Sequence, residues 1–424
     1  PVNWCFDCQS ALAEAEIEYK EKSDFAIEVI FPLYEKSLDN LQKIFNQKSL
    51  NSNGGVAIWT TTPWTIPANQ ALNVNPDQNY SLLKIKKNKH NLDWLILSTE
   101  LSKECLEKWH LDGKEVAITS GRSLKNLRFK NPLWNTDNFY KRTPEIFPAT
   151  YVEITSGTGI VHVAPAYGID DFISCKNNGL TDQKIISIVE KDGYYSPSLP
   201  LFSKLKIWDA NIKIIENLKL QNNLLNEEKY KHSTMHCWRH KTPTIFRATN
   251  QWFISMDKKV SFNNLSLREV ALREIEKTSF YPPWGKNRLR SMILNRPDWT
   301  ISRQRQWGVP IPFFINKKTN LPHPHTSLML EKIALIIEKD GIEAWQTINN
   351  NNFLNDNEDN LYEKSTDTLD VWFDSGTTHD TVINGSHKNK LTFPADLYLE
   401  GSDQHRGWFH SSLLTSCMIN NVAP

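Results

Sequence analysis

The chain has 424 residues, of which 39% are hydrophobic, and its formal net charge at pH 7 is +1. At roughly 100–200 residues per domain, this length predicts two or three domains. The near-neutral balance excludes a globally basic nucleic-acid binder, so nucleic-acid contacts would have to come from local patches. The candidate patches are residues 84–89, 286–290 and 303–305, although such charge runs are usually solvated faces.

Hydropathy and cysteine content restrict the class further. No apolar stretch approaches the roughly 20 residues that span a bilayer, and no secretory signal precedes the first elements. Six cysteines in so long a chain do not form a disulfide framework, which favours a cytosolic protein. Because the chain begins with Pro1 rather than Met and ends abruptly after a helix-like run, we expect an internal segment of a longer protein.

A strand-rich block follows the N-terminal segment. Residues 11–19 alternate between apolar side chains and glutamates, and this period of two predicts a strand although Ala and Glu favour helix. Further strands are predicted at residues 26–31, 56–60, 80–85, 92–97, 116–119, 159–164 and 186–189. Helices are predicted at residues 99–109, 170–176 and 212–220. Many strands with scattered helices predict an α+β, barrel-like domain over about residues 20–225.

The second half of the chain has a different pattern. Helical periods occur at residues 266–277 and 328–339, whereas the Asn- and Asp-rich residues 347–361 predict a loop or insertion. A short apolar strand at 397–399 leads through a Gly/Ser/Asp turn into a helix at 404–418. This order predicts a βα unit, and ligands of open α/β sheets bind where strands end and helices begin.

Three consecutive threonines, Thr60, Thr61 and Thr62, follow an apolar strand and precede Pro63. Clustered hydroxyls at a strand end offer short donors and acceptors without charge, which suits a pocket for a polar ester and a water molecule. The same run could be an ordinary Thr-rich strand edge, because Thr is common in strands.

A second constellation lies at residues 157–171, where a buried strand carries His162 and a helix opens with Asp170 and Asp171. A carboxylate there is stabilised by the positive end of the helix and could pair with an ammonium group. Alternatively, one aspartate only caps the helix and His162 is a hydrogen-bonded core histidine.

Cysteine and histidine pairs form a third pattern. Cys5 and Cys8, together with Cys237 and His240, have the spacing of a tetrahedral zinc site. The two pairs lie more than 200 residues apart, so the site exists only if the fold brings the ends of the strand-rich block together. Unpaired thiols are the alternative, and His236 is a competing ligand.

Aromatic and acidic motifs mark the second half. Residues 295–310 combine arginines with Trp307-Gly308. Trp next to Gly could wall an apolar pocket, and the arginines could pair with phosphates or carboxylates. An ordinary core tryptophan is the alternative. Residues 370–376 place two carboxylates four apart, an arrangement that we interpret as mainly structural. Residues 400–408 form the turn of the expected βα unit.

These motifs, in this order, resemble the isoleucyl-tRNA synthetases of the bacterial type over essentially the whole chain. The resemblance implies an α/β fold: part of a Rossmann-like class I synthetase core with an inserted α+β, barrel-like editing domain. It places the core in residues 1–19 and 226–424 and the editing domain in residues 20–225. Valyl- and leucyl-tRNA synthetases are the alternatives, but they carry Arg at the position of Thr62.

Two departures from the family pattern limit what the resemblance implies. Residues 165–168 read Pro-Ala-Tyr-Gly, where the family carries Gly-His-Gly or Ala-Phe-Gly. The resemblance therefore does not determine the shape of the pocket near Tyr167. The ATP signatures His-x-Gly-His and Lys-Met-Ser-Lys-Ser do not occur in the sequence. We therefore expect this segment not to activate isoleucine by itself.

For the editing reaction, the resemblance implies that Asp171 binds the α-ammonium of a misattached valine and that His162 keeps isoleucine out. Thr60, Thr61 and Thr62 would hold the ester, the terminal ribose or the water, with Thr65 as a weaker candidate. No nucleophilic triad stands out, so a positioned water is the expected nucleophile.

For the synthetic reaction, Trp307 and Trp408 would wall the isoleucine side chain, and the adenylate would contact Glu400, Gly401, Asp403 and Gln404. The implied cofactors are ATP with Mg²⁺ in the full-length enzyme and Zn²⁺ at the cysteines. The implied partners are isoleucine tRNA, isoleucine and valine, with no membrane, in a cytoplasmic monomer. A tRNA-binding, zinc-stabilised module without activity is the alternative from another class of function.

Overall fold

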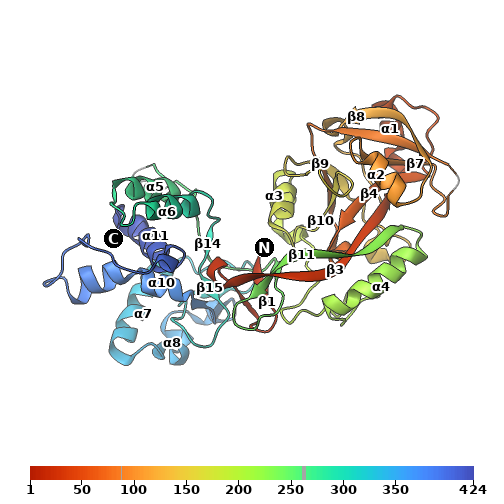
Figure 1. The fold of residues 1–424 in the computed structure, drawn as a ribbon. Helices are drawn as coiled ribbons and strands as arrows, with labels where there is room; N and C mark the ends of the chain where they lie inside the picture. Colours follow the sequence, from red (N-terminus) through yellow and green to blue (C-terminus); the bar gives the residue numbers. More distant parts are fainter. Residues whose placement is uncertain (87, 260–263) are drawn as a thin grey trace. The chain divides into compact units, whose positions relative to one another are not determined.

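The structure is a computed structural model that describes residues 1–86, 88–259 and 264–424. The chain separates into two compact units (Figure 1). Unit 1 consists of Pro1–Gln9 and Ile17–Thr249, and unit 2 consists of Ser10–Glu16 and Asn250–Pro424. The domain limits expected from the sequence stay a prediction.

A mixed six-stranded sheet with the order β11-β3-β4-β7-β6-β8 dominates unit 1. Its strands are β3 (Ile17–Pro32), β4 (Gly54–Thr60), β6 (Asn79–Ile85), β7 (Trp94–Ser98), β8 (Gly113–Ser120) and β11 (Leu224–Cys237). Only the pairing of β4 with β7 is parallel. The strands predicted at residues 26–31, 56–60, 80–85, 92–97 and 116–119 are therefore confirmed.

Helix α2 (Ser102–Lys108) is fastened to this sheet by a buried carboxylate. Glu28 on β3 accepts hydrogen bonds from Trp109 Nε1 at 2.8 Å and from Lys108 Nζ at 2.9 Å. Around these polar contacts the helix packs on an apolar core of strand residues such as Leu95 and Leu97. A buried carboxylate that is paired and hydrogen-bonded in this way avoids the cost of an isolated charge.

A smaller sheet with the order β10-β5-β9 contains the strand that carries His162. It consists of β5 (Ala71–Val74), β9 (Glu145–Pro148) and β10 (Ile160–Val163), and β5 is buried along its whole length. The prediction of a strand at residues 186–189 was wrong. The backbone N–H groups of Ile188 and Val189 donate to the Tyr167 hydroxyl instead of to a strand partner.

The remaining elements of unit 1 cover and connect the two sheets (Figure 1). They are β1 (Val2–Cys5), α1 (Leu38–Phe45), α3 (Ile169–Asn177), α4 (Ile207–Leu220), β12 (Ile245–Arg247) and the 3-10 helices η2 (Glu35–Ser37), η3 (Pro63–Ala68), η4 (Gly121–Leu124), η5 (Asn138–Tyr140) and η6 (Asp182–Lys184). β1 and β12 pair antiparallel, with Trp4 opposite Ile245. The helices predicted at residues 99–109, 170–176 and 212–220 are confirmed as α2, α3 and α4.

Unit 2 is mainly helical. Its helices are η1 (Glu14–Glu16), α5 (Leu267–Lys277), α6 (Trp284–Leu294), α7 (Thr326–Asp340), α8 (Ala344–Thr347), η7 (Asn350–Asn352), α9 (Asp356–Asp359), α10 (Val371–Gly376), η8 (His379–Ser386), η9 (Ser402–His405) and α11 (Trp408–Asn420). One core joins α5, α6 and α11 through residues such as Val270, Ile293 and Leu414. A second core lies under α7 and contains Phe314, Trp345 and Leu354. The helices predicted at 266–277 and 328–339 are confirmed, whereas residues 347–361 form short helices rather than an irregular loop.

The strands of unit 2 are short. They are β2 (Ser10–Ala11), β13 (Phe253–Ile254), β14 (Trp299–Thr300), β15 (Ser302–Arg303), β16 (Phe314–Asn316), β17 (Tyr362–Lys364) and β18 (Thr368–Leu369). The strand predicted at 397–399 is absent from the described residues. The side chains of Leu397 and Leu399 are 74% and 79% exposed, and a strand needs a neighbour to satisfy its backbone. The helix that follows begins at Trp408 rather than at residue 404.

The continuous strand predicted for residues 11–19 was also wrong. Glu16 N–H donates to the carbonyl of Ala13 at 3.0 Å, and Glu16 Oε2 accepts from Ala13 N–H at 2.8 Å. The alternating glutamates therefore do not all face solvent. Glu16 is buried and pairs with Arg305 at 2.7 Å.

This pairing corrects one of the proposed basic patches. Arg303 is buried, and its Nη2 lies 2.9 Å from Asp370 Oδ2. The arginines of residues 303–305 thus hold unit 2 together and do not form an exposed nucleic-acid patch. Lys286 and Arg290 of the second patch both pair with Glu276. The first patch includes Lys87, which lies outside the described residues.

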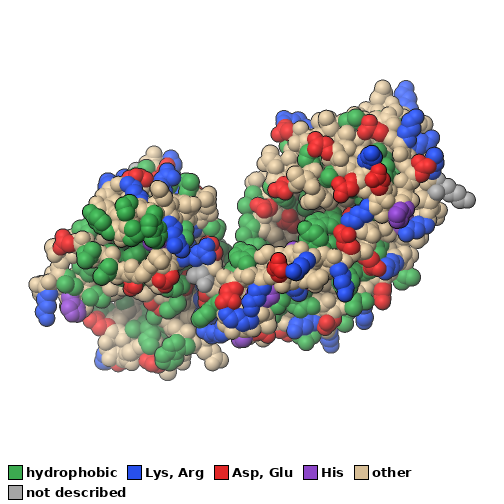
Figure 2. Space-filling model, viewed as in Figure 1, with side chains coloured by type: hydrophobic (Ala, Val, Ile, Leu, Met, Phe, Trp, Pro, Cys, Tyr) green, Lys and Arg blue, Asp and Glu red, His purple; other side chains and the backbone are tan. Residues whose placement is uncertain are grey.

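Charged side chains of both signs are interspersed over the face shown in Figure 2. This agrees with the net charge of +1 and with the absence of a globally basic field. In the part of the chain that the structure describes, no helix combines the length and the apolar character that crossing a membrane requires.

Arg142 holds the η3 segment in place, and its loss should destabilise unit 1. Its guanidinium donates to the carbonyls of Pro67 (2.6 Å), Phe139 (2.7 Å) and Asn69 (3.3 Å). Arg142→Met would leave these acceptors unpaired and should lower the free energy of unfolding by about 2–4 kcal/mol in urea titrations. Arg122→Met, which removes an exposed pair with Asp77, is the control and should change it by less than about 0.5 kcal/mol. Equal effects of the two variants would contradict this role.

Candidate functional site

The threonine run forms a hydrogen-bonded cluster where β4 ends. Thr60 Oγ1 lies 3.0 Å from Thr62 Oγ1 and accepts a hydrogen bond from Thr62 N–H at 3.1 Å. Thr62 Oγ1 lies 3.2 Å from Thr65 Oγ1, and the Thr65 hydroxyl donates to the Thr62 carbonyl at 2.8 Å. Pro63 starts the η3 turn that folds Thr65 back toward Thr62. Thr61 shares the turn but has no hydrogen bond of its side chain to a described residue.

His162 extends this cluster into the neighbouring sheet. It projects from β10, and its Nε2 lies 2.7 Å from Thr65 Oγ1. Its Nδ1 lies 3.0 Å from Asn69 Nδ2, which also donates to the Ala71 carbonyl at 2.8 Å. Because Asn69 Nδ2 is a donor, His162 Nδ1 accepts, so the ring proton is on Nε2 and points to Thr65.

Burial keeps the imidazole of His162 neutral. Desolvation lowers its pKa to about 3, because a buried imidazolium would lose its hydration without gaining a counter-ion. A ring with both nitrogens engaged and so low a pKa is a poor general base at neutral pH. The chemical contribution of His162 is therefore its shape and its hydrogen bond to Thr65.

Asp171 lies in the first turn of α3, whose N-cap is Gly168. One oxygen of Asp171, Oδ2, accepts from Ala164 N–H at 2.8 Å, and the other, Oδ1, accepts from the Tyr151 hydroxyl at 3.2 Å. Asp171 therefore binds groups that precede α3 in the chain, Ala164 and Tyr151, and is not the N-cap of the helix. Desolvation raises its pKa to about 6, against the opposing effect of these two hydrogen bonds. Asp170 beside it is exposed.

His162 and the backbone N–H that binds Asp171 lie close together in the sequence, at the end of β10 and just after it. His162 and Ala164 are two residues apart, so the imidazole and the N–H that binds Asp171 lie along one short stretch. Gly157 and Gly159, both at φ of +75°, form the turn that leads into this strand. A Cβ at Gly159 would lie 2.4 Å from the Cβ of Ser98, so the turn requires glycine there. The structure thus joins Thr60, Thr62, Thr65 and His162 in one hydrogen-bonded cluster, and Asp171 binds the backbone two residues beyond His162.

Two members of this region were missed by reasoning from the sequence. Asn69 sets the tautomer of His162, and Tyr151 binds Asp171 while its own hydroxyl accepts from Asn73 Nδ2 at 2.8 Å. Asn69 is a polar residue inside the apolar run of residues 66–72, and this was the available signal. Tyr151 offers no such signal, because its role arises only from the packing of α3.

Tyr167, at the departure from the family pattern, contacts Trp64 and the backbone of residues 188 and 189. It is buried, its ring packs edge-on against Trp64 at 5.1 Å, and its hydroxyl accepts two backbone hydrogen bonds. Its role in unit 1 is to fix the backbone at Ile188 and Val189.

The predicted metal ligands converge in unit 1. The ligand atoms of Cys5, Cys8, Cys237 and His240 all lie within 4.8 Å of one another. Cys8 Sγ lies 3.8 Å from Cys237 Sγ and 3.3 Å from His240 Nδ1, and Cys237 Sγ lies 3.7 Å from His240 Nδ1. Tetrahedral bonds of about 2.3 Å to sulfur and 2.0–2.1 Å to nitrogen place ligand atoms about 3.6–3.8 Å apart. The cluster therefore fits a zinc ion.

The backbone around the two pairs supports this arrangement. The residue after each second ligand, Gln9 and Lys241, has a positive φ, of 47° and 57°. Cys8 N–H points at Cys5 Sγ at 3.4 Å. His236, the competing ligand, is turned away, because its Nδ1 lies 3.0 Å from the carbonyl of Thr234. The antiparallel pairing of β1, which ends at Cys5, with β12, which follows His240, brings the distant ligands together.

In unit 2, the residues predicted to contact isoleucine differ in their surroundings. Trp408 stacks on Tyr398, with ring centroids 4.2 Å apart, and its Nε1 donates to the Ser375 carbonyl at 2.9 Å. Trp307, by contrast, is 93% exposed, so its ring lies almost entirely in solvent.

The residues predicted to contact the adenylate lie together in one turn before α11. Glu400, Gly401 and Asp403 are exposed. Gln404 donates to Asp403 Oδ2 at 2.9 Å and accepts from Trp408 N–H at 2.9 Å. This turn does not follow a strand, so the predicted βα unit is incomplete among the described residues.

Comparison with known proteins places the chain in a family. Residues 1–424 match the family model of tRNA synthetases class I (I, L, M and V). The chain is 55% identical over its full length to the isoleucine–tRNA ligases of Burkholderia multivorans (strain ATCC 17616 / 249) and Paraburkholderia xenovorans (strain LB400). It spans 44% of the length of each of these relatives.

Among solved structures, the editing domain of the P. knowlesi cytosolic leucyl-tRNA synthetase matches with a TM-score of 0.35 and 13% identity, covering 52% of this chain and 100% of that one. The corresponding P. falciparum domain matches with a TM-score of 0.34 and 14% identity, covering 49% and 99%. The assignment rests on the family match along the whole chain: it belongs to the tRNA synthetases class I (I, L, M and V).

Proposed function

We propose that the chain is part of an isoleucyl-tRNA synthetase and that unit 1 hydrolyses valine misattached to isoleucine tRNA. The names of the relatives at 55% identity support isoleucine as the amino acid. Thr62, which stands where valyl and leucyl enzymes are expected to carry Arg, supports the same choice against them. The proposed editing domain is the insertion over residues 20–225.

One observation carries the editing proposal. Hydroxyl and imidazole groups form an unbroken line from Thr60 through Thr62 and Thr65 to His162, and Asp171 binds the backbone two residues farther on. A single half-buried carboxylate beside neutral hydrogen-bonding groups suits a substrate with one ammonium and one ester.

The residues have separate roles in this proposal. Asp171 pairs with the α-ammonium of the valyl ester, and binding of that cation favours its ionised form. Thr60, Thr61 and Thr62 hold the ester, the terminal ribose or the water, and Thr65 fixes Thr62. A positioned water attacks the ester carbonyl, since His162 is too weak a base to generate a strong nucleophile.

His162 supplies selectivity rather than basicity. Isoleucine and valine differ by one methylene and are a standard example of a difference that a single apolar pocket rejects poorly. A second site that admits only the smaller side chain removes the error. The rigid imidazole, held at both nitrogens, limits the depth of that site.

The full-length protein would attach isoleucine to its tRNA with ATP and Mg²⁺ as a cytoplasmic monomer. In unit 2, Glu400, Gly401, Asp403 and Gln404 would bind the adenylate, and Trp307 and Trp408 would flank the isoleucine side chain. This segment contains neither ATP signature, so we expect it to edit without activating isoleucine.

Zinc is the metal that we propose for Cys5, Cys8, Cys237 and His240. Three sulfurs and one imidazole with no open ligand position are typical of structural zinc. The ion would stabilise the start of β1 and the end of β11 without taking part in catalysis. This cluster also supports a second candidate function, a zinc-stabilised tRNA-binding module without activity. Hydrolysis of valyl-tRNA for isoleucine by the folded segment, measured above the buffer rate, distinguishes editing from this module.

Replacing the carboxylate should reduce editing strongly. Asp171→Asn keeps the shape of the side chain but removes the charge that pairs with the ammonium. Loss of a buried charge pair costs about 2–5 kcal/mol, so kcat/KM for deacylation should fall by roughly thirtyfold or more. The measurement is release of valine from valyl-tRNA under single-turnover conditions. Asp170→Asn, its exposed neighbour on α3, should keep activity within about twofold. Full activity of Asp171→Asn would remove the proposed role.

Editing should depend on pH through Asp171. The raised pKa of about 6 means that the carboxylate is ionised above pH 6 and neutral below it. After subtraction of buffer hydrolysis, kcat/KM should fall as the pH decreases through about 6, by about tenfold per unit well below the pKa. A profile that is flat between pH 5 and 7 would contradict this assignment.

Removal of the metal should destabilise unit 1. We expect one zinc per chain by elemental analysis, lost on treatment with a strong chelator and accompanied by a lower unfolding temperature. Cys8→Ser should lose the zinc, whereas Cys105→Ser, at a buried cysteine outside the cluster, should retain it. Purified chain without stoichiometric metal would argue against the site.

A further inference from the structure

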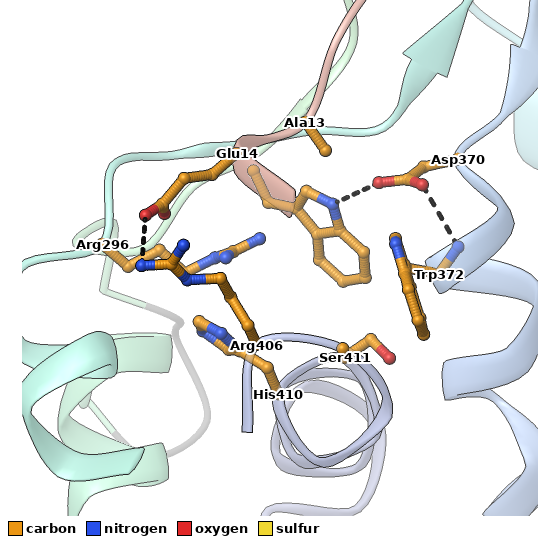
Figure 3. A pocket seen from close by; sticks show the side chains of 10 residues that line it. Ala13, Glu14, Arg296, Asp370, Trp372, Arg406, His410 and Ser411 are labelled. Atoms are coloured by element: carbon orange, nitrogen blue, oxygen red, sulfur yellow. Dashed lines mark hydrogen bonds and ion pairs between the residues drawn. The ribbon is translucent and has the colours of Figure 1, made fainter. Parts of the chain in front are cut away.

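Unit 2 contains a pocket beside the first turn of α11 (Figure 3). Its walls come from the η1 turn, the segment that leads into β14, the start of α10 and the start of α11. Trp299 and Trp372 form its apolar side, and Arg296, Arg406 and His410 face it from the polar side. None of these residues belongs to the sets proposed above for valine, isoleucine or the adenylate.

His410 is the first sign that the pocket is built for a ligand. The residue is 4% exposed, yet both of its ring nitrogens are buried without a hydrogen-bond partner among the described residues. Buried polar atoms in native proteins are almost always paired, so an imidazole with two free nitrogens requires a partner from outside. Burial, with the charges of Arg296 and Arg406, holds the pKa of His410 well below its usual range.

Arg296 is the second sign. Its Nε is buried without a hydrogen-bond partner within the described part of the chain. Its guanidinium lies over the ring of Trp299, 5.4 Å from the ring centroid. Burial lowers its pKa to about 10, so it remains a cation at neutral pH. A desolvated cation without a bonded counter-ion is costly.

The nearby carboxylates do not neutralise Arg296 by direct contact. Asp370 accepts from Trp299 Nε1 at 3.0 Å, Arg303 Nη2 at 2.9 Å and Trp372 N–H at 3.1 Å, so both of its oxygens are engaged. Glu14 pairs with Arg406 at 3.7 Å (Figure 3), and its side chain is 61% exposed. Arg296 therefore has no directly bonded carboxylate partner among the described residues, although Glu14 and Asp370 line the same pocket.

We propose that this pocket binds a small oxyanion, a phosphate group, held by Arg296, Arg406 and His410. Guanidinium groups donate paired hydrogen bonds to phosphate oxygens, and a neutral imidazole adds one N–H donor. The N-terminal end of α11, a helix of 13 residues, contributes a favourable dipole. Together these groups match a tetrahedral anion, whose oxygens would accept from the buried Nε–H of Arg296 and from the one N–H of the neutral His410 ring.

Equilibrium dialysis of the whole chain against radioactive inorganic phosphate tests the proposal, with sodium chloride holding the ionic strength constant. We expect one saturable site per chain, displaced by sulfate and only weakly by acetate. Acetate that competes as well as sulfate would assign the pocket to carboxylates and overturn the phosphate assignment. Absence of saturable binding up to 10–20 mM, about the range of weak metabolite sites, would overturn the proposal as a whole.

Three variants distinguish phosphate binding in the pocket from non-specific attraction by positive charge. Arg296→Met keeps the aliphatic packing on Trp299 and should weaken phosphate binding at least tenfold. Glu14→Gln removes the competing carboxylate and should strengthen it two- to fivefold. Arg290→Met removes a half-exposed guanidinium of the same unit, paired with Glu276, and should leave binding unchanged. Equal losses in Arg296→Met and Arg290→Met would show non-specific attraction only.

Stability in phosphate-free buffer distinguishes a ligand-binding arginine from a structural one. Because the guanidinium of Arg296 is desolvated without a directly bonded carboxylate among the described residues, Arg296→Met should leave the unfolding temperature unchanged or raise it. A marked decrease would show that Arg296 supports the fold, and would overturn its assignment to an anion.

The unmodified chain offers a test without a mutation in the site. In chain labelled with ¹⁵N-histidine, the ring resonances missing from the His410→Gln spectrum identify His410. Added phosphate should shift these resonances and raise the titration midpoint of His410, while His323, paired with Glu358, should not respond. Resonances of His410 that do not move at saturating phosphate would overturn its role.

Discussion

A neutral imidazole held by two neighbours is the constraint on which the polar cluster of unit 1 depends. Burial removes the charge of His162, and the donor group of Asn69 makes Nδ1 the acceptor. The proton is therefore on Nε2, and Thr65 has to receive it. The Thr65 hydroxyl in turn donates to the Thr62 carbonyl. One amide thus sets the direction of each hydrogen bond between the small sheet and the end of β4.

This order depends on backbone geometry that side chains hold in place. Arg142 binds the carbonyls of Pro67 and Asn69, so the η3 segment cannot shift relative to β5 without breaking charged hydrogen bonds. On the other side, α3 is fixed when Asp171 binds the backbone after β10. The candidate residues Thr60, His162 and Asp171 lie near the ends of β4, β10 and α3. The side chains that hold them in place, Asn69 and Arg142, come from loops. Rigid placement of this kind is what catalysis by positioning requires.

The sequence predicted the buried strands β4, β6, β7, β8 and β10 and part of β3, because alternation and short apolar runs reflect a sheet with buried faces. It missed the long, largely polar β11 and the short β1, β5, β9 and β12. It failed where tertiary contacts override the pattern. Glu16 belongs to an alternating run, but it turns inward to Arg305. Residues 397–399 have an apolar strand composition but lack a neighbour to pair with. Composition cannot show whether a partner strand is present.

The candidate site was predictable in its residue types but not in its contacts. Threonines, a histidine and aspartates in motif order indicate the chemistry. The contribution of Asn69 and the hydrogen bond from Tyr151 to Asp171 become visible only when β5, β10 and α3 are placed in space. The same holds for the cysteine pairs, which lie far apart in the sequence and meet through the pairing of β1 with β12.

The register of β3 and β11 has a consequence for the chain between them. β3 and β11 run antiparallel from Ile17 opposite Cys237 to Val29 opposite Leu224, so the two ends of the intervening chain lie side by side. A segment whose ends are joined in this way can lengthen or shorten without changing the distance between them. The closure entropy of such a loop grows only slowly with its length. A change in the length of the segment between β3 and β11 therefore need not move the residues that precede β3 and follow β11.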